Sequence, residues 1–192
     1  MATNNENRVL RRILMSFGED YSINEIARSC SLAPNGAFKI LRKFERQGVL
    51  KPKKIANIVS YKINFEDNKT KNILGLSLIP DLEGKLKFRM EDLKELKETT
   101  EIGVIFGSYT QEKKQPNDLD ILIVVNERKY PKYKLISRKV YQTIPIKVHE
   151  VIQTEEDLRK NIKKKDKVII DILKNGVILW GQDKLIDVIK DE

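Results

Sequence analysis

The sequence predicts an α+β protein in two parts, residues 1–67 and 68–192. Apolar residues recur at helical spacing through much of the first part, which is typical of amphipathic helices that share a core. In the second part, the apolar, β-branched runs 102–106 and 119–125 read as strands, and helical patterns precede and follow them. A chain of 192 residues with 40% hydrophobic content can supply a core for each part.

Composition narrows the class of protein. The only cysteine is Cys30, so no internal disulfide can form, which suits a reducing cytoplasm. No apolar run approaches the roughly 18 residues of a transmembrane span, and the polar N-terminus has no apolar signal region behind it. We therefore expect a cytoplasmic protein with no membrane partner. The net charge of +9 is compatible with nucleic acid, nucleotides or acidic protein surfaces.

Two helices open the first part. Apolar residues at helical spacing predict an amphipathic helix over residues 7–17, ended by Gly18. A short second helix follows Ser22, a suitable N-cap, and Glu25 completes its capping box. A short turn then leads to a third helix.

The third helix is predicted over residues 35–47, with Gly48 after its last turn. Its apolar stripe is predicted to comprise Phe38, Leu41 and Phe44. The polar and basic residues outside this stripe are Asn35, Lys39, Arg42, Lys43 and Arg46. Residues 49–54 and 58–63 are then expected to pair as a hairpin with its tip near Ala56 and Asn57.

This order of helices, turn and hairpin resembles the winged helix-turn-helix of archaeal and bacterial transcription regulators. In that fold the third helix enters the major groove of double-stranded DNA, and its early residues meet base edges. The resemblance implies base contacts from Asn35 and Lys39. It implies phosphate contacts from the basic residues Arg42, Lys43, Arg46, Lys53 and Lys54. The alternative is a winged helix used only for dimerisation or protein contact.

Residues 102–125 carry the strongest sign of chemistry. Gly107 and Ser108 break the first strand, and a glycine there lets backbone N–H groups come close to a phosphate. Asp118 and Asp120 open the second strand, where alternation points both carboxylates the same way. The two charges would repel each other, and a bound cation such as Mg²⁺ removes that cost. The pattern predicts a phosphate-binding turn beside a metal site.

The Gly-Ser pair, the gap and the Asp-x-Asp strand resemble the DNA polymerase β-like nucleotidyltransferase superfamily, in particular its minimal nucleotidyltransferase branch. The resemblance implies an α/β domain with a mixed sheet that starts near residue 68, after the winged helix. It implies that Asp118 and Asp120 hold one or two Mg²⁺ ions. It also implies that the nucleoside triphosphate binds at Gly107, Ser108 and Tyr109.

Departures from the family's pattern leave open whether catalysis is retained. Tyr109 stands where an Arg is common, and Asn117 replaces a common Ser. Active relatives usually carry a third acid on the next strand, which we expect at residues 144–152. Alternation directs His149 to the cleft as a hydrogen-bonding residue and Glu150 to a core edge. A bulge would bring Glu150 into the site, so Glu150 is kept as the candidate third catalytic acid.

Helices are also expected over residues 69–79, 85–97 and 158–173, the last after an N-cap at Thr154. The segment 177–181 resembles the closing strand of the family, with Trp180 packed in the core.

The resemblance implies a Mg²⁺-dependent nucleotidyltransferase that moves a nucleoside monophosphate, AMP from ATP, onto a hydroxyl of a protein or small-molecule acceptor. A HEPN-type toxin is one protein acceptor that the resemblance suggests. One alternative is a DNA-binding transcription regulator whose degenerate nucleotidyltransferase domain senses nucleotide or forms a homodimer. Another is an antitoxin-like partner that neutralises a toxin by binding alone.

Overall fold

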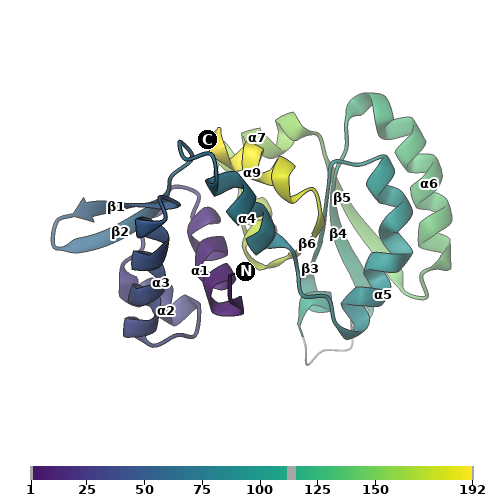
Figure 1. Cartoon of the computed structure of the whole chain (residues 1–192). Coiled ribbons are helices and arrows are strands. Elements are labelled where there is room, and N and C mark those ends of the chain that lie inside the picture. Colours follow the sequence, from purple (N-terminus) through teal and green to yellow (C-terminus); the bar gives the residue numbers. More distant parts are fainter. Residues whose placement is uncertain (1, 112–115, 192) are drawn as a thin grey trace. The chain divides into compact units, whose positions relative to one another are not determined.

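A computed structural model describes residues 2–111 and 116–191 (Figure 1). The chain forms two compact units, Met1–Leu78 and Ile79–Glu192. Helix α4 (Thr70–Leu78) belongs to the first unit, and the domain boundary expected after residue 67 stays a prediction. Within the described residues, no helix combines the length and the apolar character needed to cross a membrane.

The first unit consists of three helices, a hairpin and a fourth helix. The elements are α1 (Asn4–Leu14), α2 (Ile23–Ser29), α3 (Pro34–Arg46), β1 (Leu50–Ile55), β2 (Ile58–Ile63) and α4. The first helix begins earlier than predicted because Thr3 and Glu6 form a capping box at its start. The predicted capping box of Ser22 and Glu25 is confirmed, as is the hairpin with its tip at residues 56–57.

The apolar stripe of α3 differs from the prediction at one residue. Leu41 and Phe44 are buried as expected, but Phe38 is 45% exposed. Ala37 takes the buried position instead, because residues four and seven apart share a helix face. An aromatic ring therefore lies on the outer surface of the helix predicted to read DNA.

The second unit packs helices around one sheet. Among the described residues, its first seven elements, in chain order, are α5 (Gly84–Leu93), η1 (Lys94–Glu98), β3 (Ile102–Phe106), η2 (Gly107–Thr110), β4 (Asp118–Val124), η3 (Glu127–Lys129) and α6 (Tyr130–Thr143). They are followed by β5 (Lys147–Gln153), α7 (Glu155–Lys163), α8 (Lys167–Asn175), β6 (Val177–Trp180) and α9 (Gln182–Lys190).

The strand order is β5-β4-β3-β6, with β4 and β5 parallel and the other neighbours antiparallel. This confirms the mixed sheet. Figure 1 shows α5 and α6 on one side of the sheet and α7 and α9 on the other. The parallel β4–β5 pair carries the predicted site residues at the end where both strands begin.

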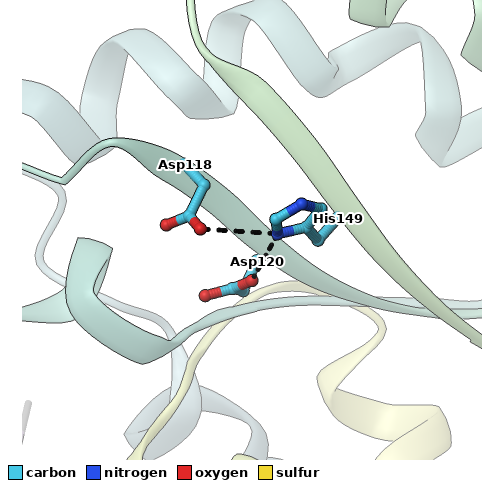
Figure 2. A group of neighbouring side chains, drawn as sticks. All are labelled: Asp118, Asp120 and His149. Carbon is cyan, nitrogen blue, oxygen red and sulfur yellow. Dashed lines mark ion pairs between the residues drawn. The ribbon is translucent and has the colours of Figure 1, made fainter.

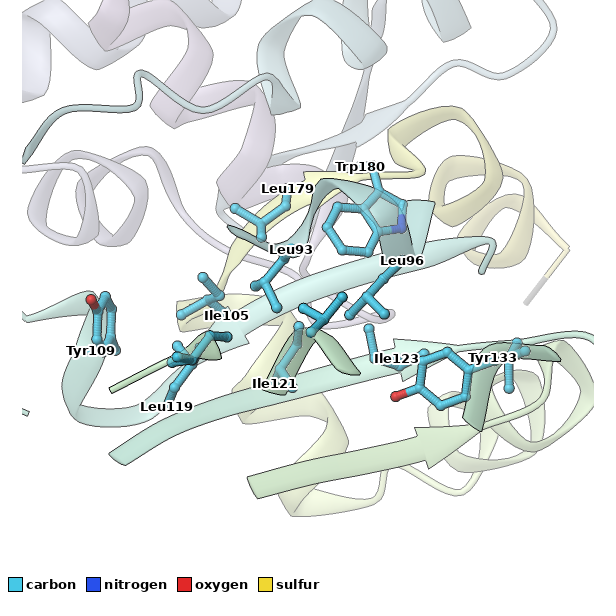
Figure 3. Packing of buried hydrophobic residues seen from close by; sticks show 13 residues of the cluster. Leu93, Leu96, Ile105, Tyr109, Leu119, Ile121, Ile123, Tyr133, Leu179 and Trp180 are labelled. Atoms are coloured by element: carbon cyan, nitrogen blue, oxygen red, sulfur yellow. The ribbon is translucent and has the colours of Figure 1, made fainter. Parts of the chain in front are cut away.

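One face of the sheet contributes to a hydrophobic core of the second unit (Figure 3). Leu93, Leu96 and Tyr133 from the helices pack against Ile121 and Ile123 of β4. The predicted core role of Trp180 is confirmed: the side chain is 2% exposed, and its indole N–H donates to Oγ1 of Thr100 at 3.0 Å.

Two elements differ from the predictions. The strand expected at residues 144–152 begins only at Lys147, because α6, which the sequence did not reveal, ends at Thr143. The single helix expected over 158–173 is two helices. Lys165 adopts a left-handed backbone with φ 54°, and the side chain of Asp166 then caps α8 by accepting from the backbone N–H of Val168.

Candidate active site and metal centre

The turn after β3 depends on Gly107. Its φ of 70° lies in the left-handed region that side chains rarely adopt. A Cβ at this position would lie 2.4 Å from Oδ2 of Asp120. Glycine therefore lets the turn approach the aspartate and leaves room beside the carboxylate for a ligand.

The next two residues of the turn are placed differently. Ser108 is half-buried. Tyr109 is 6% exposed and joins the hydrophobic core, and Nζ of Lys85 lies 5.2 Å from its ring centroid. Burial raises the pKa of the Tyr109 hydroxyl. Of the three residues predicted to bind nucleotide, only Tyr109 directs its side chain into the core, so a contact from it would have to come from the backbone.

The structure brings both predicted aspartates together with His149 (Figure 2). Asp120 is the register partner of His149 in the parallel pair, and Asp118 is that of Lys147. Nδ1 of His149 lies 3.4 Å from Oδ2 of Asp118 and 3.4 Å from Oδ1 of Asp120. The side chains are 38%, 25% and 45% exposed for Asp118, Asp120 and His149. The cluster is thus partly sheltered yet open to solvent.

Glu150 lies on the opposite face of β5, so the structure does not bring it to the aspartate pair. The carboxylate accepts hydrogen bonds from Tyr133 and Tyr141 and pairs with Lys134, all from α6. Partial burial alone would raise the pKa of Glu150, but these partners hold it below its ordinary value. Burial, together with the nearby Glu150 carboxylate, raises the pKa of both tyrosines. No bulge interrupts the β4–β5 register from Asp118 to Val124, which is why alternation keeps Glu150 out of the site.

The residues present fit a divalent cation. One ligand atom each from Asp118, Asp120 and His149 lies within 4.8 Å of the other two. Carboxylate oxygens suit Mg²⁺ and Mn²⁺, and an imidazole nitrogen suits several first-row metal ions. Without an ion, the two carboxylates would face each other on a strand whose other residues are buried.

The residues predicted to bind DNA divide into two groups. Three have acidic partners within the first unit: Arg42 with Glu45, Lys43 with Glu6 and Lys53 with Asp20. The others are exposed: Asn35, Lys39, Arg46 and Lys54. Beside them, Phe38 lines a groove with Ile58 and Val59 of β2.

Sequence reasoning placed His149 on the correct face but did not assign it to the metal site. The signal was available, since alternation on β5 opposite the aspartates identifies the third side chain that reaches them. The partners of Glu150 were missed for another reason. They come from α6, which had not been predicted.

Comparisons with known proteins agree with this geometry. Residues 89–185, about half of the chain, match the family described as Polymerase beta, Nucleotidyltransferase. No curated protein and no solved structure gives a match. The matched segment contains the Gly107 turn, both aspartates and the mixed sheet that brings them to His149. By sequence and by the arrangement of these residues, the chain belongs to the polymerase beta nucleotidyltransferase family.

Proposed function

We propose that this protein transfers a nucleoside monophosphate, AMP from ATP, onto a hydroxyl of a protein or small-molecule acceptor. The observation that carries the proposal is the convergence of Asp118 and Asp120 beside the left-handed turn at Gly107. This arrangement offers a place for phosphate next to a place for a cation, which is what a nucleoside triphosphate with its counterion requires.

The chain's own residues have separate tasks in this proposal. The turn at Gly107 and Ser108 binds the phosphates that leave as pyrophosphate, through backbone N–H groups and the serine hydroxyl. Asp118 and Asp120 hold Mg²⁺ or a related ion. When bound, such an ion neutralises charge on the phosphates in the transition state.

The reaction exchanges one phosphorus–oxygen bond for another. The acceptor oxygen bonds to the α-phosphorus, the bond between that phosphorus and the bridging oxygen breaks, and pyrophosphate leaves. The acceptor's proton is released to water. Glu150 takes no part in this proposal because its carboxylate is occupied on the other face of β5.

The test is transfer of label from each α-³²P nucleoside triphosphate, with Mg²⁺ or Mn²⁺, in the presence and absence of cell lysate. Wild type is compared with Asp120→Asn and with Glu150→Gln. We expect label transfer by wild type and by Glu150→Gln, and none by Asp120→Asn. A labelled lysate protein would identify the acceptor, including a toxin if one is modified.

Three results would contradict the proposal or a part of it. Label transfer by Asp120→Asn equal to that of wild type would show that the reaction does not require Asp120. No transfer by wild type, together with measurable nucleotide binding, would favour a regulator that senses nucleotide. Loss of transfer in Glu150→Gln despite a folded protein would restore Glu150 as the third acid.

We also propose that the first unit binds double-stranded DNA. The supporting observation is the order α1, α2, α3 and hairpin, with Asn35, Lys39 and Arg46 exposed on α3 and Lys54 exposed on the hairpin. Three residues that line the nearby groove, Phe38, Ile58 and Val59, are apolar, as are the thymine methyl groups of the major groove. Lys43 and Lys53 would have to leave their acidic partners in order to contact phosphate.

Salt dependence of binding to a mixed-sequence duplex tests this second proposal. Lys54→Gln should lower the slope of log K against log salt by about 1, because each phosphate contact releases about one counterion. The matched control is Lys160→Gln, an exposed lysine of α7 that pairs with Glu156. Equal slopes for the two variants, or no binding by wild type, would favour a protein partner for the first unit.

A further inference from the structure

His149 presents a single ring nitrogen to both aspartates. Nδ1 is equally far, 3.4 Å, from an oxygen of Asp118 and an oxygen of Asp120 (Figure 2). The backbone fixes this placement, because His149 and Asp120 are register partners on adjacent parallel strands. The third group of the cluster therefore comes from a regular strand, and strand alternation directs it toward the pair.

The distance separates two explanations for this arrangement. An N–H···O hydrogen bond usually spans about 2.7–3.2 Å, and one ring N–H cannot point straight at two separate oxygens. Two ligands that each lie about 2.1 Å from one ion are about 3.0 Å apart at a right angle and about 3.4 Å apart at the tetrahedral angle. The observed separations of 3.4 Å exceed a good hydrogen bond, and they are short enough for both oxygens and Nδ1 to reach one ion after a small side-chain adjustment.

Two carboxylate oxygens and one imidazole nitrogen, as ligands, affect which divalent ion the site prefers. Mg²⁺ takes oxygen ligands and retains water in preference to protein nitrogen. Among divalent first-row ions, affinity for nitrogen-containing sites rises from Mn²⁺ onward, and imidazole is a suitable ligand for several of them. A site with two carboxylates and one imidazole thus favours an ion that accepts both donor types.

We propose that His149 is the third protein ligand of the divalent ion, through Nδ1, and that this nitrogen makes the site select Mn²⁺ over Mg²⁺. The inference rests on the metal site of the proposed function, but it concerns binding and can be tested without any transfer of nucleotide.

The test uses the fact that His149 is the only histidine of the chain. In untagged protein with Mn²⁺ as the probe, imidazole nitrogen coupling in pulsed electron paramagnetic resonance can come only from His149. Mn²⁺ affinity and its competition by Mg²⁺ are measured on the same samples, with and without a non-hydrolysable ATP analogue. The variants are His149→Asp, which supplies an oxygen donor, and Glu127→Gln, an exposed acid beyond the other end of β4.

We expect imidazole coupling in wild type and in Glu127→Gln, and its loss in His149→Asp. We also expect the preference for Mn²⁺ over Mg²⁺ to fall by about tenfold or more in His149→Asp, since changes outside the ligand shell alone typically cost 10–100-fold in metal affinity. Bound Mn²⁺ without imidazole coupling, an unchanged metal preference in His149→Asp, or no Mn²⁺ binding with or without the analogue would overturn the proposal.

The outcomes distinguish this inference from the proposed function. Imidazole coupling in a protein that transfers no label would support His149 as a metal ligand and contradict the proposed transferase activity. The protein could instead show label transfer that depends on Asp120 but no imidazole coupling. That result would support the transferase activity and contradict His149 as a metal ligand.

Discussion

Neighbouring polar residues on the two faces of β5 have different surroundings. On one face, Glu150 has three partners from α6 and is mostly shielded from solvent. On the other, His149 and the two aspartates of β4 face one another around a space open to solvent, with separations too long for good hydrogen bonds. One residue along the strand thus separates a closely hydrogen-bonded carboxylate from an open cluster of possible metal ligands.

This difference indicates what each group contributes. A partly buried carboxylate that accepts several hydrogen bonds stabilises the fold, and its partners become costly to leave unpaired if it is removed. Carboxylates that converge repel each other, and a bound cation offsets that cost. The contrast supports the proposal that Asp118 and Asp120 hold the ion, while Glu150 stabilises the fold.

The largest effect is expected from Asp120→Asn. Label transfer should fall by about a thousandfold or more, because a bound ion supplies several kcal/mol of transition-state stabilisation. The free energy of unfolding should stay the same or rise, since the change removes one of two repelling charges. A variant that loses transfer only because it unfolds would contradict the assignment, so urea denaturation is measured in parallel.

Glu150→Ala should have the opposite effects: it should lower stability and leave ion binding unchanged. We expect a loss of about 3 kcal/mol in the free energy of unfolding, because Tyr133, Tyr141 and Lys134 lose a shared partner in a sheltered place. Affinity for the divalent ion should change little in the folded protein. A loss below about 0.5 kcal/mol in urea denaturation, the range of ordinary surface substitutions, would mean that the network contributes little.

The pH dependence of stability gives a smaller effect with a defined sign. The pKa of Glu150 is lower in the folded protein than its ordinary value. Its contribution is therefore fully present above the unfolded value of about 4.3 and is lost as pH falls through the lower folded value. Glu150→Gln should flatten the stability profile below about pH 5, as measured by urea denaturation at a series of pH values.

Other carboxylates with lowered pKa values, such as Glu155 and Asp157, titrate in both proteins and provide the common background. Identical profiles for wild type and Glu150→Gln would show that Glu150 is not held ionised by its partners.

Tyr141→Phe should have the smallest effect, about 1 kcal/mol of unfolding free energy, which is typical of one hydrogen bond. Its hydroxyl donates to Glu150 at 3.1 Å, while Tyr133 and Lys134 still contact the carboxylate. A change as large as that of Glu150→Ala would indicate that the network depends mainly on Tyr141.

Much of this contrast follows from the sequence, because strand alternation is a local property. The spacing of Asp118 and Asp120 predicted their convergence, and the parity of β5 placed His149 on their face and Glu150 on the other. The partners of Glu150 could not be read from the sequence, since α6 has a weak apolar pattern. The exposure of Phe38 was missed because Ala37, a small residue, fills the buried position on α3.

The most direct test of the account is the shift in thermal unfolding midpoint caused by a saturating divalent ion, measured on wild type, Asp120→Asn and Glu150→Gln. An ion present at about 100 times its Kd stabilises the folded state by about 2.7 kcal/mol. The account predicts this stabilisation in wild type and in Glu150→Gln, and none in Asp120→Asn. Equal shifts in all three proteins, or a shift lost only in Glu150→Gln, would contradict the separation of the two faces.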